Sequence, residues 1–532
     1  MFRENTAHNQ ISLCESFNWM NKRIQEKLKK SWAPIYYEHV FCKIDEKPFA
    51  VLYSDVGRPN FPVNISLSLE FIKHFLNLSD DELIDNFYFN YLVNYAVGIR
   101  VLGELNLAKR TIYEFRDRIY KYTLAHPDQD DLIFGQFVKL IKGFAEIAGI
   151  SMKEQRMDST MFMSNIKKAG RLSLAFDVLI KSVKVIPKGI LPKQLEETLQ
   201  PEFKTKILFK TKASETESTL DHILSLCQEA RDTLKSISTP QVEEALRIIS
   251  RFISEQAELD ENTNKLRAKN SKEISASSLQ SVHDEDATFR NKNGKSQSGY
   301  VANITETCDK NNPVQLITDY AVAPNIKSDV DFIKERISII KENTNCEKVT
   351  VDGGYYCEDP TGNVEDVEVN FTDMTGRCPS DKISVTDFEL DEKNEIIITC
   401  PNGTKPIHAG YKNGQSVAHF PTEACKHCEH RDRCPAKPQK KSFVLRFSSK
   451  TITAAIQRNK INANRTENIS SRAGIEGTNS ALKRRHRMDK LQVRGKVKCN
   501  VVVGLKVIAQ NIRRFVNYML GRVKVKNLVL QG

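Results

Sequence analysis

The chain has 532 residues, of which 40% are hydrophobic and 27% charged, and its formal net charge is +12. This composition is typical of a globular protein with several domains, and the positive charge favours a polyanionic partner, either nucleic acid or an anionic membrane surface. No apolar run is long enough to span a bilayer or to form the core of a signal peptide. We therefore expect a cytoplasmic protein whose 12 cysteines are thiols or metal ligands.

The first 150 residues are predicted to be mostly helical. Residues 66–99, SLSLEFIKHFLNLSDDELIDNFYFNYLVNYAVGI, have apolar side chains at helical spacing. Ser79 and Glu82 have the spacing of a capping box. The acids Asp80, Asp81 and Glu82 are therefore expected to begin a helix rather than to catalyse a reaction.

After about residue 155 the pattern changes. Asp158 is predicted at the end of a short extended segment, EQRMDSTMFMSN. Residues 299–307 and 314–324 predict two antiparallel strands, and residues 328–344 predict an amphipathic helix. A short β-branched strand then ends at Asp352, before a Gly-Gly turn. A carboxylate at the carboxyl end of a buried strand is a common position for a catalytic residue, and the alternative is a turn-forming Asp.

Asp158, Asp352 and Glu476 are candidates for a two-metal site. Two-metal phosphoryl transfer uses a few carboxylates on rigid elements to hold divalent ions about 3.5–4 Å apart. Mg²⁺ selects oxygen ligands, so no histidine or thiolate is needed. Three acids among 67 are a weak signal by themselves. Their context strengthens it, because the sequence predicts two strand ends and one helix for the three.

Residues 470–490, SSRAGIEGTNSALKRRHRMDK, predict a basic helix that keeps the acid Glu476. At about 100° per residue, Arg472, Glu476, Asn479 and Lys483 lie at roughly 0°, 40°, −20° and 20°, and so share one stripe. Arg472 and Glu476 also have the i,i+4 spacing of a structural ion pair.

Two glycines, Gly474 and Gly477, interrupt the same helix. Each weakens a helix by roughly 1 kcal/mol relative to alanine. Glycines at these positions indicate that another backbone or DNA approaches closely.

The segments around the three acids resemble those of a known protein family. RAGIEGTNSALK contains R-x3-E-x6-K as Arg472, Glu476 and Lys483, and it resembles the third-acid helix of DDE transposases of bacterial insertion sequences, in the group marked by Y-x2-R-x3-E-x6-K. VDGGYY resembles their second-acid strand end, and RMDSTMFMSN resembles their first-acid segment. HDEDATFRNKNGKSQSGYVANI and residues 66–99 also resemble parts of these transposases, so the resemblance covers most of the chain.

The chain departs from this family at Ile469, where the tyrosine of the motif would stand. In relatives this tyrosine helps to hold the DNA backbone near the cut. The departure therefore concerns the expected processing of DNA ends and not the metal site.

The resemblance implies an α/β fold with a ribonuclease H-like mixed sheet, a helical N-terminal domain, a helical insertion and a small cysteine-rich subdomain. Asp158, Asp352 and Glu476 would bind Mg²⁺ or Mn²⁺, cut one strand at each element end and join the freed 3′-OH to target DNA. Arg472 and Lys483 would position phosphates. The implied partner is double-stranded DNA, bound by a homodimer at the nucleoid in the bacterial cytoplasm, without a membrane.

The implied domains follow the sequence pattern. They are residues 1–150, a helical DNA-binding and dimerisation domain; 151–180 and 283–375, the first parts of the catalytic core; 181–282, a helical insertion and flexible joint; 376–450, the cysteine-rich subdomain; and 451–532, the third-acid helix and basic C-terminal helices.

A group of cysteines predicts a structural zinc site. Cys425, Cys428 and Cys434 form C-x2-C-x5-C, and Cys400 lies upstream. Four thiolates satisfy a tetrahedral zinc site, and the nearby His427 and His430 are alternative ligands. The competing interpretation is four free buried thiols. The isolated cysteines are expected in the core: Cys14, Cys42, Cys227 and Cys499.

The C-terminal part is strongly basic. From Lys483 to the end, 14 Lys and Arg residues accompany one acid, Asp489. This imbalance predicts phosphate contacts that weaken steeply with salt. Membrane attachment competes with this prediction, but the apolar face of the last helix is needed for the core, and Arg513 and Arg514 are expected on its solvent side. The predicted DNA contacts are Arg472, Asn479, Lys483, Arg484, Arg485, Arg487 and Arg494.

Two other functions stay open at this stage. A domesticated or inactive transposase copy would bind DNA as a regulator without cutting it. A stand-alone metal-dependent nuclease would share the carboxylate site but would not transfer strands.

Overall fold

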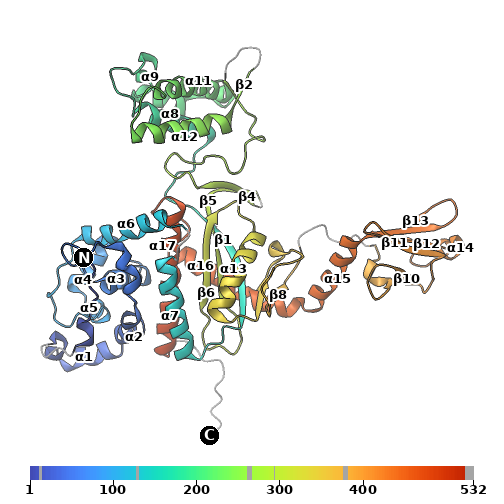
Figure 1. Cartoon of the computed structure of the whole chain (residues 1–532), viewed down its shortest axis with the longest axis horizontal. Helices are drawn as coiled ribbons and strands as arrows, with labels where there is room; N and C mark the ends of the chain where they lie inside the picture. The colour runs from blue at the N-terminus through green and yellow to red at the C-terminus, as the bar shows by residue number, and fades with distance from the viewer. Residues whose placement is uncertain (11–14, 128–130, 261–265, 293, 375–381, 522–532) are drawn as a thin grey trace, which may run out of the picture. The chain divides into compact units, whose positions relative to one another are not determined.

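Figure 1 shows the computed structural model, which describes residues 1–10, 15–127, 131–260, 266–292, 294–374 and 382–521. The chain divides into two compact units. The main unit is Met1–Cys346 with Ile475–Gly532, and the second unit is Glu347–Gly474. Each unit is described by itself. Together their helices, antiparallel strands and parallel strands make a mixed α/β fold.

The main unit begins with helices, as the apolar periodicity predicts. Ser79 and Glu82 form the predicted capping box of α4: Ser79 Oγ accepts from Glu82 N at 3.2 Å, and Glu82 Oε2 accepts from Ser79 N at 2.7 Å. The helices of this part are α1 (Lys22–Lys29), α2 (Trp32–His39), α3 (Val63–Leu76), α4 (Asp80–Phe89), α5 (Tyr91–Ala96), α6 (Lys109–Ala125) and α7 (Leu132–Ala148). Short 3-10 turns lie at Ala7–Asn9, Ser16–Trp19, Phe41–Lys43 and Lys47–Leu52.

The sheet of the main unit is built around one long strand. β5 (Lys295–Thr307) pairs antiparallel with β1 (Glu154–Phe162), β4 (Thr288–Lys292) and β6 (Ile317–Pro324). The predicted antiparallel pair at 299–307 and 314–324 is therefore confirmed. Asp158 lies opposite Ile304 in the middle of β1, so its prediction at a strand end is wrong. The strand continues to Phe162 because β5 offers pairing partners along that whole stretch.

Helix α17 (Lys496–Met519) lies within the core of the main unit. It packs against α3, α7 and β6 (Figure 1), and its apolar residues share one hydrophobic core with the N-terminal helices, β5 and β6. Arg513 and Arg514 are half-buried: Arg513 donates to the Phe75 carbonyl, and Arg514 donates to Glu306 Oε2 at 2.8 Å. Their predicted solvent position is wrong, because α17 is covered on more sides than its apolar pattern indicates.

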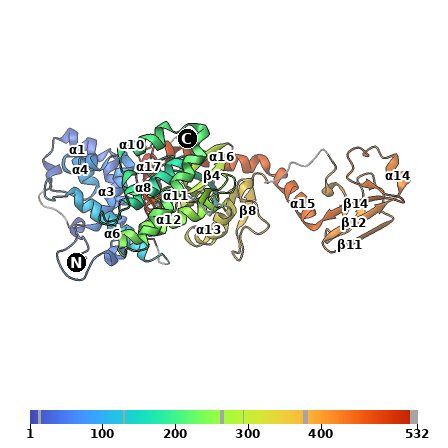
Figure 2. The same cartoon turned by 90° about the horizontal axis from the view of Figure 1, so that it is seen from above.

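A second hydrophobic core lies between Leu174 and Val282. Figure 2 shows α8 (Arg171–Val183), α11 (Thr216–Leu234) and α12 (Pro240–Gln256) side by side, and their buried residues form this core. The smaller elements here are α9 (Lys193–Glu197), α10 (Pro201–Thr205), a short π-helix (Lys206–Lys210), a 3-10 turn (Ala213–Glu215), β2 (Ala257–Leu259) and β3 (Leu266–Ala268). The later helix α13 (Asp329–Thr344) begins after Ser328 as predicted, with Ser328 Oγ accepting from Asp331 N at 3.0 Å.

The second unit contains a parallel pair of strands, β7 (Lys348–Val351) and β8 (Glu368–Phe371). A separate antiparallel sheet has the order β11-β12-β14-β13. The strands of this sheet are β11 (His408–Lys412), β12 (Gln415–Phe420), β13 (Lys437–Pro438) and β14 (Phe443–Ser448). The other elements of the second unit are the 3-10 turns η7 (Gly353–Tyr355) and η8 (Val385–Asp387), the strands β9 (Glu389–Leu390) and β10 (Ile397–Thr399), and the helices α14 (Thr422–Lys426) and α15 (Ser449–Ala463). Helix α16 (Arg465–Arg484) begins in the second unit and ends in the main unit.

The isolated cysteines divide. Cys227 and Cys499 are buried, which confirms the prediction for these two, whereas Cys42 is exposed and the prediction is wrong there. Cys14 lies outside the described residues. Within the described ranges, no helix has both the length and the apolarity that a bilayer crossing needs.

Candidate catalytic and metal-binding sites

Asp158 and the third-acid helix meet in the main unit. Asn479 Nδ2 donates to Asp158 Oδ2 at 3.0 Å, and Asn479 is only 7% exposed. Glu476 is exposed and precedes Asn479 by three residues in α16. Side chains three apart on a helix have Cβ atoms about 5–6 Å apart. The structure therefore brings Asp158 and Glu476 into the same region.

The oxygen atoms of this region suit a hard cation. Asp158 and Glu476 offer carboxylates, and the Oδ1 of Asn479 is buried and has no hydrogen-bond partner among the described atoms. An unsatisfied buried oxygen is costly unless water or an ion reaches it. Hydrated Mg²⁺ takes oxygen ligands and keeps several waters, so the donor chemistry fits this ion.

A buried carboxylate, Glu306 on β5, is hydrogen-bonded to α16 through Thr478. Glu306 is fully buried, and its Oε2 accepts from Thr478 Oγ1 at 2.6 Å and from Arg514 at 2.8 Å. Its Oε1 accepts from Arg156 on β1 at 2.8 Å. Thr478 is two residues from Glu476, so this ionic cluster fixes the helix turn that carries the acid. The sequence interpretation missed the cluster, and its only signal was a charged residue inside the β-branched run GYVANITET.

Gly477 has open space at its side-chain position. A Cβ built there meets no atom of the described chain within 4 Å. Of the two explanations for this glycine, a close protein backbone is therefore excluded among the described residues, and the approach of DNA stays a prediction.

Asp352 lies in the second unit, at the position that its sequence predicts. It follows the last residue of β7, and its Oδ1 accepts from the backbone N–H of Gly354 at 2.8 Å. Arg472 in α16 donates to Asp352 Oδ2 at 3.4 Å. A Cβ at Gly353 would lie 3.0 Å from the backbone of Asp373, so only glycine fits this turn without a shift.

Helix α16 also contacts the end of β8. The side chain of Asn468 is buried and donates to the Phe371 carbonyl at 3.2 Å. Ile469, at the position of the family tyrosine, is 47% exposed. The second unit therefore holds Asp352, Arg472 and the first half of α16 together.

The remaining predicted DNA contacts lie at and after the end of α16. Lys483 Nζ is 3.9 Å from Asp489, and Arg484 and Arg485 are exposed. Arg487 is exposed at a positive φ of 51°, and exposed Arg494 donates to the Asn165 carbonyl at 2.7 Å. The bases after residue 521 lie outside the described residues.

The four cysteines predicted as zinc ligands line one cavity of about 30 Å³ in the second unit. None of the four forms a disulfide. Burial raises the pKa of the Cys425 thiol, and the neighbouring Cys434, Cys400 and Cys428 raise it further. As arranged here, the described chain contains no group of three or more His, Cys, Asp or Glu side chains that could hold a metal ion.

Two segments of the chain match known families. Residues 399–516 match the family described as Transposase DDE domain, and this segment includes Glu476 and the cysteines. Residues 33–118 match the family described as Transposase domain (DUF772), which spans α2 to α6. No curated protein and no solved structure matches the chain. The two matches support a DDE-type transposase.

Proposed function

We propose that this chain is a DNA transposase that binds the terminal inverted repeats of its element and performs metal-dependent strand cleavage and strand transfer. The observation that carries the proposal is the hydrogen bond from Asn479 to Asp158, which joins one candidate acid to the helix that carries another, Glu476. The Transposase DDE domain match over α16 supports the same reaction class.

In this proposal Asp158, Asp352 and Glu476 are the metal-binding residues of a ribonuclease H-like transposase. DDE transposases use divalent metals, and carboxylate oxygens are the ligands that Mg²⁺ and Mn²⁺ accept. When bound, the ions make water a better nucleophile and offset charge on the phosphate. Asn479 orients Asp158, whereas Arg472 orients Asp352 and positions the incoming phosphate.

The reaction consists of two phosphoryl transfers. In the first, a water oxygen forms a bond to phosphorus at the element end, the P–O3′ bond breaks, and the strand keeps a free 3′-OH. In the second, this 3′-oxygen forms a bond to a target phosphorus, and the target strand leaves with its own 3′-OH. One P–O bond forms for each that breaks, so neither step needs an oxidant or reductant.

Two transposase chains on one pair of element ends are the assembly that this chemistry implies, so we propose a homodimer on DNA. A domesticated copy that only binds DNA, or a nuclease without strand transfer, would share many of the same residues. The presence of all three acids favours the enzyme.

One experiment separates these functions. Wild type and Glu476→Gln are incubated with Mg²⁺ or Mn²⁺ and DNA that carries the ends of the element. We expect metal-dependent nicking followed by joining in the wild type and neither in the variant. Binding without cleavage by either protein would refute the enzyme, and cleavage without joining would favour the nuclease.

We also propose that Cys400, Cys425, Cys428 and Cys434 hold a structural zinc ion. Support comes from their common cavity and from the mutual influence of the thiols on the pKa of Cys425. A divalent cation would relieve the repulsion between thiolates and fix the turns around them.

A further inference from the structure

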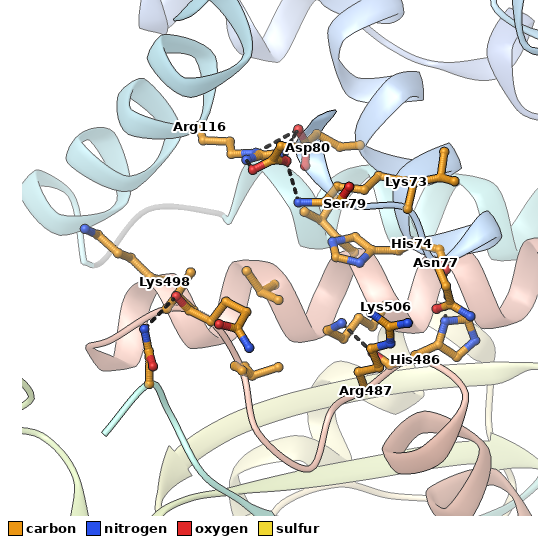
Figure 3. A pocket seen from close by; sticks show the side chains of 18 of the residues that line it. Lys73, His74, Asn77, Ser79, Asp80, Arg116, His486, Arg487, Lys498 and Lys506 are labelled. Carbon is orange, nitrogen blue, oxygen red and sulfur yellow. Dashed lines mark hydrogen bonds and ion pairs between the residues drawn. The ribbon is translucent and has the colours of Figure 1, made fainter. Parts of the chain in front are cut away.

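A large cavity in the main unit has no role in the proposed chemistry. Its volume is about 830 Å³, and we call it the basic pocket. One wall is formed by the end of α3, the start of α4 and α6, and the other by residues 486–494 and the first half of α17 (Figure 3). Both walls belong to the main unit.

The acids on the α3–α4–α6 wall are already neutralised. Arg116 binds Asp80 at 2.7 Å and Glu70 at 2.8 Å, and Lys73 binds Asp80 at 2.7 Å. Figure 3 shows Arg116 and Asp80 joined in this way. The third acid of the lining, Asp117, pairs with Lys121 at 2.7 Å. These carboxylates therefore leave no negative charge to balance the opposite wall.

The opposite wall carries cations, one of which, Arg487, interacts with the carboxylate of Glu82 at longer range than an ion pair. Among the described residues, no carboxylate lies within ion-pair distance of the five Lys and Arg side chains on this wall. They are Arg487, Lys490, Arg494, Lys498 and Lys506. The first four are exposed at the pocket mouth, whereas Lys506 is only 8% exposed.

Lys506 shows that the positive charge inside the pocket is not compensated. Its ammonium donates to the carbonyl of His486, a neutral acceptor. Burial, together with the nearby Lys73 and Arg487, lowers the pKa of Lys506 to about 8. A buried cation that is repelled by two others is costly, and an anion in the pocket would offset that cost.

The histidines of the pocket contribute no charge at neutral pH. Burial lowers the pKa of His486 to about 4, and its ring lies between the His74 carbonyl and Gln510. Burial also holds the pKa of His74 well below its usual range. The positive charge therefore comes from Lys and Arg alone.

The lining of the basic pocket begins just after the helix that carries Glu476. From Glu476 to the end of α16 at Arg484 the helix rises about 12 Å, and the pocket lining begins two residues later, at His486. One DNA strand advances about 3.4 Å per nucleotide. The pocket thus lies within a few nucleotides of any phosphate that reaches Glu476.

We propose that the basic pocket binds the backbone phosphates of a DNA strand a few nucleotides from the phosphodiester that is cut. This inference rests on the proposed function, because it takes the position of the cut from Glu476. The cations at the mouth are spread from Arg487 to Lys498 rather than focused on one point, which suits successive phosphates better than a small anion. The N-terminal helices then contribute directly to holding the DNA.

The test measures binding without cleavage. A short fluorescein-labelled duplex of arbitrary sequence is titrated in EDTA across a salt series, and binding is followed by anisotropy. The variant combines Lys490→Gln, Arg494→Gln and Lys498→Gln, all at exposed positions, and circular dichroism checks that it folds like the wild type. Loss of three phosphate contacts reduces the slope of log affinity against log salt by about 2.7, with at least a tenfold loss of affinity at about 0.15 M salt.

The matched control removes the same number of charges elsewhere. Lys188→Gln, Lys193→Gln and Lys204→Gln lie at exposed positions of the part around α9 and α10, and this triple variant is expected to keep the wild-type slope. An unchanged slope in the pocket variant would overturn the proposal. If the pocket variant lost affinity for inorganic pyrophosphate but bound the duplex as the wild type does, the result would overturn the proposal in favour of a small phosphate ligand.

A second measurement does not depend on the folding of a triple variant. Tyr113 lines the pocket and is 44% exposed, so p-benzoylphenylalanine at this position should crosslink to the duplex. The same probe at Tyr91, which is 48% exposed outside this pocket, is the control. Crosslinking at Tyr91 alone would overturn the proposal. A wild type that binds in EDTA but never cleaves with Mg²⁺ would refute the proposed function and leave the pocket supported.

Discussion

Glu306 Oε2 accepts a hydrogen bond of 2.6 Å from Thr478 Oγ1, which joins a fully buried carboxylate on β5 to the helix that carries Glu476. The same carboxylate forms ion pairs with Arg156 and Arg514. A buried charge cluster of this kind is sensitive to the removal of one partner, because the remaining charges stay buried. The turn of α16 that carries Glu476 thus depends on the buried ionic cluster around Glu306.

Glu306→Gln keeps the shape of the side chain and removes its charge. We expect the free energy of unfolding to fall by about 3–5 kcal/mol, since Arg156 and Arg514 would lose the buried carboxylate that they share. Urea denaturation measures the change. Glu342→Gln, at an exposed position on α13, is the control and should change stability by less than about 0.5 kcal/mol. Equal stabilities of the two variants would contradict the assigned role of Glu306.

Asn479→Leu tests whether Asn479 positions Asp158 or contacts DNA. Because its amide is buried against Asp158, we expect DNA affinity in EDTA to stay at the wild-type value. Strand cleavage with Mg²⁺ should slow by about 100-fold, since a misplacement of about 1 Å has that effect. Ser480→Ala, on the next position of the helix, is the control. A loss of affinity without a change in the cleavage rate at saturating DNA would assign Asn479 to DNA binding instead.

The cysteine cluster makes a prediction about metal content. We expect the purified chain to carry about one zinc ion, as tetrahedral cysteine sites do, and Cys425→Ser or Cys428→Ser to abolish it. Elemental analysis measures the stoichiometry. Thermal unfolding should shift to lower temperature after chelation, because zinc binding stabilises the folded site. Cys42→Ser, at an exposed cysteine, should keep its zinc. A zinc-free wild type of normal stability would leave only the thiol interpretation.

Lys506 predicts a pH dependence of stability. Its pKa of about 8 in the folded chain lies below the ordinary lysine value of about 10.4, so the unfolded state binds more protons between these two pH values. Stability should therefore rise with pH, by about 2 kcal/mol between pH 8 and 10. The groups that face Lys506 are Lys73 and His74 on α3 and His486 and Arg487 on the opposite loop.

The comparison with Lys506→Met isolates this group from tyrosines and cysteines that titrate in the same range. The stability difference between wild type and variant should shrink as the pH rises, because the variant has no buried charge to lose. Urea denaturation at several pH values measures it. A difference that stays constant from pH 8 to 10 would show that Lys506 titrates at its ordinary pKa.

Local features were predictable from the sequence. The capping box of Ser79 and Glu82, the helix start at Ser328 and the position of Asp352 after β7 all agree with the prediction. Each depends on hydrogen bonds or chain geometry within a few residues, so the neighbouring residues of the sequence are enough to predict it. The helical character of residues 465–484 follows from the same kind of local pattern.

Long-range partners were decided by the tertiary structure alone. Asp158 lies in the middle of β1 because β5, far along the chain, pairs with all of that strand. Arg514 is held inside by Glu306, 208 residues away, and Asn479 is held by Asp158, 321 residues away. A charged or amide side chain on a helix has the same local pattern whether it meets water or a buried partner. Only the folded chain supplies that partner, because burial of a charge is stable only where an opposite charge has been brought to it.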